Sequence, residues 1–297
     1  LGIDTIFSIL HVDYHKETYL DNSNCKEVFS TLTGYVDEDL TFSSQKWVKD
    51  YKSRTIDVGY RARPLPIYLG KGGKEKTEIA EKFLKFSSKS NLKLDIKTSE
   101  ESRLYGNDWN RFLGNIRCCL GVESGTSIFD VHGIIKNEMD EYLLKFPEAK
   151  EDEIWREVLQ KYENQISYRA ISPRIFDSAI FKNLMIYYEG QYQGVMMPGI
   201  HFVELKKDFS NFDYVSKVIS EESYYDEFTS RSYEDLILSQ KYSYRNFIKD
   251  FCQKVDLKPI KEGETNRNSL EIFPSRGRKI VLGIYPYLTK PFKRNFY

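Results

Sequence analysis

Polar and charged residues follow several short apolar runs of this sequence, and their types suit a phosphorylated, hydroxyl-rich ligand. One run ends at Gly59 and is followed by Arg61 and Arg63, and Glu189 and Gly190 stand at the end of a later run. Glycine allows close approach of a ligand to the backbone, arginine offers a forked donor to phosphate oxygens, and a carboxylate accepts hydrogen bonds from hydroxyls. Neither a G-x-x-x-x-G-K-[ST] loop nor a G-x-G-x-x-G motif accompanies them, so the expectation rests on residue types.

A second polar segment, ESGTS, follows the apolar run around residues 118–122. Its first three residues, Glu123, Ser124 and Gly125, are typical of a small cradle for an anion or a ribose at the end of a strand. Taken alone, the same residues suit an ordinary loop with serine and threonine turns. We therefore interpret this segment together with its neighbours.

The stretch ISPRIFDSAIF predicts a helix whose first turn faces the same ligand. Ser172 is expected to cap the helix, and Arg174 and Asp177 then lie in its first two turns. His201 begins a later apolar run, where it can bond to a substrate hydroxyl or serve as a structural histidine. If the strand ends converge, these side chains join the glycines and arginines in one binding site.

Alternating short apolar runs and longer amphipathic segments predict an α/β fold. We expect a Rossmann-like, mostly parallel sheet flanked by helices, followed by a helical C-terminal segment. The expected strands are Asp4–Leu10, Thr55–Gly59, Lys93–Ile96, Cys118–Val122, Leu184–Tyr188 and His201–Leu205. The expected helices are Lys74–Phe86, Asp108–Arg117, Lys136–Lys145, Asp152–Glu163, Pro173–Phe181 and Phe212–Ile219.

Three segments are expected along the chain. Residues 1–50 are polar and broken and are interpreted as the end of an N-terminal domain and a linker. Residues 51–220 form the predicted ligand-binding, Rossmann-like domain, and residues 221–297 form C-terminal helices and a tail. Because the chain opens on an apolar run without methionine, we expect an upstream half that is missing from this sequence.

The composition excludes some classes of protein. Lysine plus arginine and aspartate plus glutamate both number 44 among 297 residues, so the charge expected of a general nucleic-acid binder is absent. No run approaches the roughly 20 apolar residues of a membrane-spanning helix. The four cysteines form no C-x-x-C pair, which favours reduced thiols in a cytoplasmic protein. The basic segments SRGRK and KPFKR are compatible with peripheral contact with acidic lipid at the inner face of the membrane.

The run SPRIFDSAIFKNLMIYYEG, with the later PGIHFVEL and DFSNFDYV, resembles the C-terminal half of GT-B glycosyltransferases. It looks closest to bacterial surface-polysaccharide transferases and the CgeB-like group. DVGYRARPLPIYLG, YGNDWNRFLG and LGVESGTSIFDVHG are similar to segments of the same family, so the resemblance covers roughly residues 32–247. Asp177 stands where that family has glutamate, and its side chain is shorter.

The resemblance implies a transferase that moves a sugar from a nucleotide-sugar donor to a glycan or lipid-linked glycan. Arg174, Asp177 and Glu189 match the family's functional positions, and Arg61 and Arg63 are added phosphate candidates. The resemblance further implies activity without an essential metal or other cofactor, because cationic side chains and helix N-termini stabilise the departing diphosphate. It places the acceptor on the N-terminal half, of which residues 1–50 would be the end, and makes residues 51–220 the nucleotide-sugar-binding domain.

Two other interpretations stay open. One is a non-catalytic nucleotide- or glycan-binding module of the same fold. The other is a metal-dependent hydrolase built on His11, Asp13 and His15, which share one face if the segment HVDYH is a strand. Turnover with a nucleotide sugar separates the first alternative from the transferase, and metal analysis tests the second.

Overall fold

Five short apolar segments form a parallel sheet, in the spatial order β4-β3-β5-β8-β9. The structure is a computed structural model that describes residues 3–130, 132–165 and 168–256. The strands are β3 (Ile56–Arg61), β4 (Leu94–Lys97), β5 (Ile116–Gly121), β8 (Leu184–Tyr188) and β9 (Val203–Leu205), and every pairing among them is parallel. All five residues of β8 are buried, as expected for a central strand covered on both faces.

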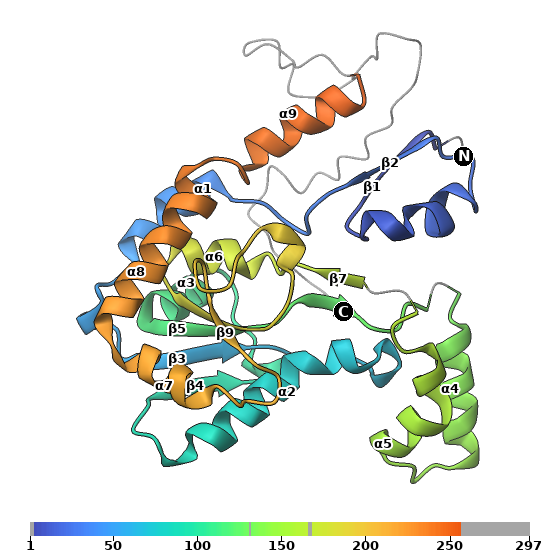
Figure 1. Ribbon diagram of the computed structural model, residues 1–297, viewed down its shortest axis with the longest axis horizontal. Helices are drawn as coiled ribbons and strands as arrows, with labels where there is room; N and C mark the ends of the chain where they lie inside the picture. The colour runs from blue at the N-terminus through green and yellow to red at the C-terminus, as the bar shows by residue number, and fades with distance from the viewer. Residues whose placement is uncertain (1–2, 131, 166–167, 257–297) are drawn as a thin grey trace. The chain divides into compact units, whose positions relative to one another are not determined.

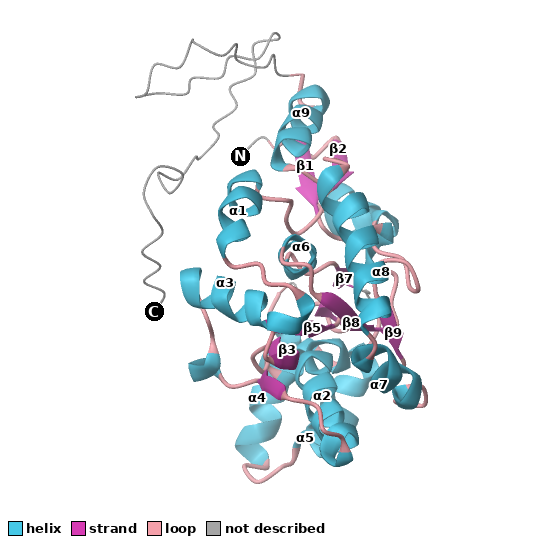
Figure 2. Ribbon diagram, turned by 90° about the vertical axis from the view of Figure 1, so that its left-hand side faces the viewer, coloured by secondary structure: helices cyan, strands magenta, loops and turns pink. Residues whose placement is uncertain are grey.

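Helices cover both faces of this sheet (Figure 2). One face packs on α2 (Lys71–Phe86), α7 (Phe212–Ser220) and α8 (Glu222–Tyr233). The other face packs on α3 (Gly106–Asn115), α6 (Arg174–Ile180) and η11 (Glu234–Leu238). Cys118 and Cys119 belong to the two different cores, which confirms that the two thiols point to opposite faces of β5. The predicted Rossmann-like α/β fold is confirmed.

The order of the strands determines where a ligand can bind. The chain passes from β3 outward to β4, then crosses back over β3 to β5 and continues to β8 and β9. The helix after β3 lies on one face and the helices after β4 and before β8 lie on the other, so the direction of winding reverses between β3 and β5. Open α/β sheets bind their ligands at such a reversal, outside the carboxyl ends of the strands.

A separate two-stranded sheet precedes the main one. Strands β1 (Thr5–Ser8) and β2 (Glu27–Ser30) pair in parallel and are connected by the short turns η1 (Val12–Tyr14) and η2 (Lys16–Leu20). The apolar run predicted as one strand over residues 4–10 is therefore shorter, and in the described part of the chain it does not join the main sheet.

A helical insertion interrupts the crossover between β5 and β8. It is connected through the antiparallel ribbon of β6 (Ser124–Thr126) and β7 (Tyr168–Ala170). Its helices α4 (Ile134–Lys145) and α5 (Glu151–Ile154), continued by η8 (Trp155–Leu159) and η9 (Gln160–Tyr162), enclose a small apolar core of their own. Figure 1 shows this insertion on the side of the sheet toward which the strand arrows point.

Several predicted boundaries shift by a few residues. Helix α3 ends at Asn115 rather than Arg117, because Ile116 already pairs with Ile56 as the first residue of β5. The remaining short elements are α1 (Glu38–Ser43), η3 (Ser44–Lys46), η4 (Tyr51–Ser53), η5 (Ile67–Leu69), η6 (Ser87–Lys89), η7 (Glu100–Ser102) and η10 (Tyr192–Gly194).

The chain divides into two compact units, one over residues 1–244 and one over residues 245–297. Of the second unit, the structure describes most of helix α9 (Tyr244–Lys254). The basic segments SRGRK and KPFKR lie outside the described residues. None of the described helices is at once long enough and apolar enough to cross a membrane.

Candidate anion-binding site

Three cationic side chains gather at the carboxyl edge of the sheet, near the reversal between β3 and β5. Arg63 lies two residues beyond β3, Lys76 lies in the second turn of α2, and Arg174 is the first residue of α6. Burial, and then the charges of Arg174 and Arg63, lower the pKa of Lys76 below its usual range. Lys76 is therefore close enough to each of the two arginines to be repelled by it. Such a cluster stabilises a bound anion.

No carboxylate in the described chain forms an ion pair with Arg63, Lys76 or Arg174. The guanidinium of Arg174 instead donates through Nη1 to the carbonyl of Arg61, at the end of β3. It also lies over the indole ring of Trp109, with 5.4 Å between the guanidinium carbon and the ring centroid. These contacts fix the position of the charge without neutralising it.

Arg61 occupies a different environment from the one predicted for it. Its side chain points to the α3 face, where its Nη2 donates to both carboxylate oxygens of Asp95 at 2.7 and 2.8 Å. Its Nη1 donates to the carbonyls of Tyr60 and Asp95, and its guanidinium lies over the ring of Phe112. The side chain is only 7% exposed. The structure therefore commits Arg61 to the protein's own groups, and only its backbone carbonyl contacts the cationic cluster.

Glu75, next to Lys76 in sequence, anchors a second group of charges at this edge. Its side chain is 10% exposed and accepts both ends of the Arg169 guanidinium, at 2.8 and 3.1 Å. It also accepts from the Lys207 ammonium at 2.9 Å, so one carboxylate serves two cations. Since helix α2 presents Glu75 and Lys76 in different directions, Glu75 leaves the charge of Lys76 uncompensated.

Two carboxylates, Glu123 and Glu189, follow neighbouring strands of the sheet. Glu123 comes after β5 and accepts the backbone N–H of Tyr192 at 2.8 Å. Glu189 comes directly after β8 and accepts the backbone N–H of Lys207 at 3.1 Å. A Cβ atom built on Gly190 would lie 2.8 Å from Oε2 of Glu123, so glycine is required for the carboxylate to stay where it is. This pair offers hydroxyl acceptors at the same edge of the sheet as the cations.

Asp177 lies one turn after Arg174 and is half-buried against α3. Its Oδ2 accepts from the indole Nε1 of Trp109 at 3.1 Å. Burial raises the pKa of Asp177 above its ordinary range. The Trp109 donor and the positive charge of Arg174 both oppose this rise, and the charge of Asp37 adds to it. Asp177 therefore faces the interface between α3 and α6.

The N-terminus of α2 already holds side chains of the insertion. The N–H of Lys71 points at both carboxylate oxygens of Glu163, at 3.2 and 3.3 Å, and the N–H of Gly72 donates to Ser127 Oγ at 2.7 Å. Trp155 donates its indole N–H to the same carboxylate.

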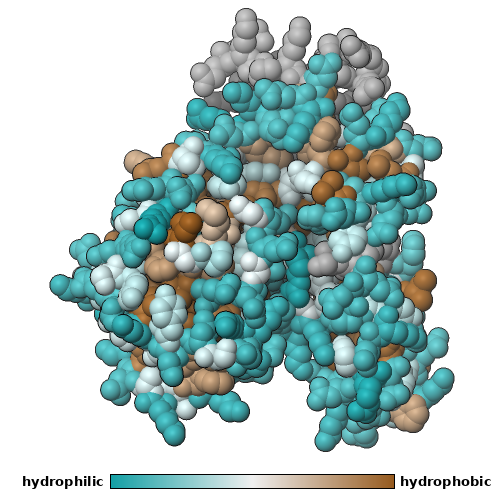
Figure 3. Space-filling view, viewed as in Figure 1, coloured by the Kyte–Doolittle hydropathy of each residue, from teal (hydrophilic) through white to brown (hydrophobic). Residues whose placement is uncertain are grey.

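Figure 3 shows a notch between the lobe that carries the sheet and the smaller lobe of the insertion, and its walls are largely hydrophilic.

Four other predicted positions lie away from the cluster or are used in packing. Gly59 does not end its strand: β3 continues to Arg61, and a Cβ on Gly59 would meet the ring of Phe112 at 2.8 Å. Ser124 and Gly125 pair with β7 as a strand rather than forming an open loop. Helix α6 begins at Arg174 with Pro173 as its N-cap, so Ser172, the expected cap, lies one position before the observed one.

His201 is a structural histidine. It precedes β9, and because the strands are parallel it lies at the amino edge of the sheet, opposite the cluster. Its Nδ1 accepts from the N–H of Met197 at 3.0 Å, and its Nε2 lies 3.0 Å from Asp235 Oδ2. Both ring nitrogens therefore have partners within the protein, which favours the structural one of the two interpretations of His201.

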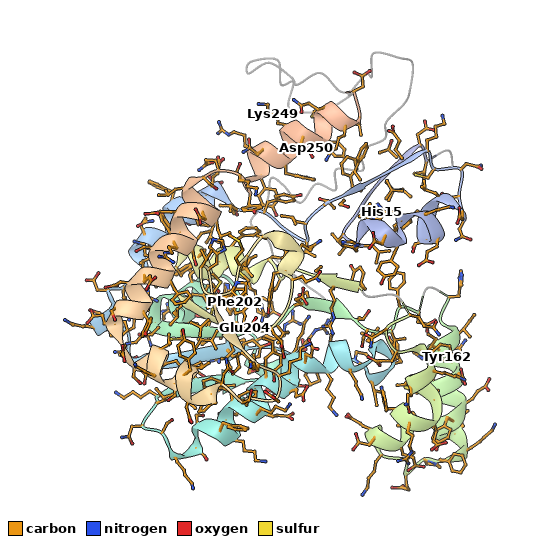
Figure 4. All side chains as sticks on the ribbon, in the orientation of Figure 1. His15, Tyr162, Phe202, Glu204, Lys249 and Asp250 are labelled. Atoms are coloured by element: carbon orange, nitrogen blue, oxygen red, sulfur yellow. The ribbon has the colours of Figure 1, made fainter. Side chains whose placement is uncertain are left out.

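The histidines of HVDYH do not form a metal site. The segment folds into short helical turns, so its side chains do not share the face of a strand. His15 is 4% exposed and its Nε2 lies 2.8 Å from the carbonyl of Leu10, whereas the His11 side chain is 57% exposed. Figure 4 shows His15 on the unit of β1 and β2. Across residues 3–130, 132–165 and 168–256, no group of three or more metal-ligating side chains comes together.

Comparisons with known proteins give limited information. No protein-family model matches the chain, and no curated protein matches it. Among solved structures, 21 chains match, including the crystal structure of TarM, a glycosyltransferase. That superposition has a TM-score of 0.43 and 12% identity, and it covers 84% of this chain and 43% of TarM. The chain thus spans less than half the length of that structure. The fold assignment rests on strand order and helix placement, because a superposition at this level establishes neither fold nor function.

Sequence reasoning missed Lys76, Trp109, Glu75, Arg169 and Lys207 as members of this edge. Lys76 is the last residue of the segment GKGGKEK, residues 70–76, and only its position indicates a role. It falls in the second turn of the helix that follows the first strand of the sheet. Trp109 carries no comparable signal, because its role depends on contacts between α3 and α6 across 65 and 68 residues of sequence.

Proposed function

We propose that this chain binds a nucleotide sugar at the carboxyl edge of its sheet and acts as a glycosyltransferase. The observation that carries the proposal is the cluster of Arg63, Lys76 and Arg174 beside the reversal between β3 and β5. Its mutual repulsion is relieved when a diphosphate binds, and a diphosphate gains charge as the bond to the sugar breaks. Cations that are held in place before the reaction therefore bind the leaving group more strongly than the intact donor.

The two carboxylates support a donor that also carries hydroxyls. Glu123 and Glu189 lie at adjacent strand ends, and in each of them one oxygen accepts a backbone N–H. We assign the other oxygen of each to ribose or sugar hydroxyls. The proposal needs no metal for charge neutralisation, since the three cations supply it. The acceptor is a glycan or a lipid-linked glycan, and no nucleic acid takes part.

A panel of ligands tests the binding step. Inorganic diphosphate, nucleoside diphosphates and nucleotide sugars are added to the full chain, and the midpoint of thermal unfolding is measured. A ligand at about 100 times its dissociation constant stabilises the folded state by about 2.7 kcal/mol. The proposal fails if no member of the panel stabilises the protein. The exposed Lys85 near the other end of α2 provides a matched control. Lys85→Met should leave the ligand response unchanged, whereas Arg174→Ala should reduce it.

Turnover tests the chemical step separately. Release of the nucleoside diphosphate from each stabilising nucleotide sugar is followed with and without a glycan acceptor. Acceptor-dependent release supports a transferase. Tight binding without release or transfer, under every acceptor tried, supports the non-catalytic nucleotide-binding module instead.

A further inference from the structure

One aromatic residue of α3, Trp109, contacts two charged residues of α6 at once. Its indole N–H donates to Asp177 Oδ2 at 3.1 Å, and its ring lies 5.4 Å from the guanidinium carbon of Arg174. The ring is itself stacked on Phe112, with 5.6 Å between centroids. Trp109 is therefore fixed from one side by the core and fixes α6 from the other.

The spacing of Arg174 and Asp177 on α6 would allow them to form an ion pair with each other. Arg174 and Asp177 are three residues apart on one helix, a separation at which opposite charges on neighbouring turns ordinarily attract each other. Yet Arg174 and Asp177 form no ion pair within the described residues, and Oδ2 of Asp177 accepts from the indole N–H of Trp109 instead. The guanidinium of Arg174 lies instead at the carbonyl of Arg61, beside the cationic cluster.

We propose that Trp109 is a positioning residue of the anion site, and that its N–H holds the carboxylate of Asp177 away from Arg174. This inference rests on the proposed function, because the charge kept available is the one assigned to the diphosphate. The indole ring supplies a surface for the guanidinium of Arg174. The indole N–H bonds to the Asp177 carboxylate, which would otherwise compete with the ligand for Arg174. If the donor is removed, Asp177 turns to Arg174 and neutralises it.

The surroundings of Asp177 agree with this role. The groups that face it are Trp109 from α3, Arg174 from its own helix and Asp37 at the start of α1. Burial in this position raises the pKa of Asp177, and the Trp109 N–H counters that rise. A carboxylate that has lost its donor there gains more from pairing with Arg174 than an exposed one would.

Three variants test the inference with inorganic diphosphate as the probe. Trp109→Phe keeps an aromatic ring at this position and removes the N–H together with part of the indole ring, a loss of size that the control below shares. It should weaken binding roughly tenfold, the scale of one lost guanidinium contact to phosphate. Trp109→Phe combined with Asp177→Asn should restore the affinity, because the neutral amide does not compete for Arg174. Asp177→Asn alone should strengthen binding. Trp47→Phe, at a half-buried tryptophan that packs on the same core, is the control.

The pH dependence gives a readout that a merely structural role would not move. Trp109→Phe is expected to bind diphosphate more weakly than the unsubstituted protein, and this difference in affinity (the deficit) should shrink as the pH falls and Asp177 takes up a proton. The ligand's own titration is common to both proteins and cancels in the ratio. A deficit that does not change with pH, or that Asp177→Asn fails to restore, overturns the inference.

A measurement without ligand keeps this result separate from the proposed function. In labelled protein, the Arg174 side-chain N–H resonance should move in Trp109→Phe and return in the double variant. If the unsubstituted protein binds no diphosphate, the proposed function fails, and this resonance alone decides whether Trp109 separates the two charges. A resonance that stays in place in Trp109→Phe refutes the positioning role.

Discussion

Replacing Lys76 with methionine should stabilise the empty protein and weaken its binding of diphosphate. Methionine keeps the unbranched side chain and removes the charge, so the packing of α2 on the sheet is largely preserved. In the folded state, burial and the charges of Arg174 and Arg63 lower the pKa of Lys76. The charged form is therefore less favourable in the folded protein than in the unfolded chain. Removing the charge removes that penalty.

The two effects of Lys76→Met differ in size and in sign. We expect a gain in the free energy of unfolding of roughly 0.5–1 kcal/mol, the upper part of the range for partly solvated charge pairs. For a domain of this size that gain raises the unfolding midpoint by about 1–4 °C. The loss in binding should be larger, about 1.5–3 kcal/mol, which is the scale of a hydrogen bond between charged groups. That loss corresponds to roughly a 10- to 150-fold weaker affinity.

The assay pairs denaturant unfolding with calorimetric titration of inorganic diphosphate, both at low salt because screening weakens the repulsion. The sign of the pH effect follows from the direction of the pKa shift. Lys76 is fully charged below its folded pKa, so the advantage of Lys76→Met is complete there. The advantage is lost as the pH rises from the folded pKa toward the usual value for lysine. Lys85→Met makes the same chemical change on the same helix, and we expect neither effect from it.

One pattern of results would refute the reasoning about the cluster. If Lys76→Met destabilises the empty protein and leaves diphosphate affinity unchanged, Lys76 serves packing and its ammonium reaches solvent. A stability gain without a binding loss would show that the three charges repel one another and that the ligand binds elsewhere.

Substitutions at three further positions test other parts of the site. Arg174→Ala should weaken diphosphate binding by about 1.5–3 kcal/mol. Arg174→Lys should recover only part of the lost affinity, because lysine lacks the planar fork. Unchanged affinity in a folded Arg174→Ala variant would remove Arg174 from the site. Glu189→Gln should reduce the affinity for a nucleotide sugar much more than the affinity for inorganic diphosphate. Equal losses of the two affinities in calorimetry would point to a structural role for Glu189. Gly190→Ala should displace the Glu123 carboxylate, which its new Cβ would approach to 2.8 Å. The expected result is weaker nucleotide-sugar binding with a loss of stability below about 1 kcal/mol, because the displaced group is a flexible chain end.

The central strands were predictable because burial on both faces leaves a continuous apolar run. Leu184–Tyr188 is predicted and observed over the same residues, and all of them are buried. The position of α6 after Ser172 and Pro173 was predictable to within one residue from turn chemistry. In such segments, local sequence and tertiary environment favour the same structure.

The strands that sequence reasoning missed are defined by their partners. Ser124–Thr126 is a strand only because it pairs with Tyr168–Ala170, more than 40 residues later. Its three small residues carry no apolar alternation, and its middle residue is a glycine with φ of 121°. Glu27–Ser30 likewise depends on its pairing with β1. Pairing of this kind is a tertiary property and leaves little trace in a short segment.

The same limit explains the outcome for the site. Arg61 and Arg63 follow one strand and look equivalent in the sequence, but their environments differ. Arg61 still belongs to β3 and faces α3, where Asp95 on the neighbouring strand takes its guanidinium. Arg63 lies beyond the strand and joins the cluster with Lys76. Residue types predicted an anion site at this edge, whereas pairing across the sheet decides which arginine remains available.

The occupied N-terminus of α2 gives the cationic side chains their importance. In many α/β proteins the first N–H groups of the helix after the leading strand bind phosphate. Here Glu163 and Ser127 accept those N–H groups, and a side chain on Gly72 would collide with Arg169. A carboxylate at this position also cancels part of the positive potential of the helix end. Charge for a diphosphate must then come from side chains, and the uncompensated cations of the edge lie one turn further along α2 and across on α6. A cluster that repels itself is costly to maintain in a folded protein, and binding an anion is the function that such a cost would serve.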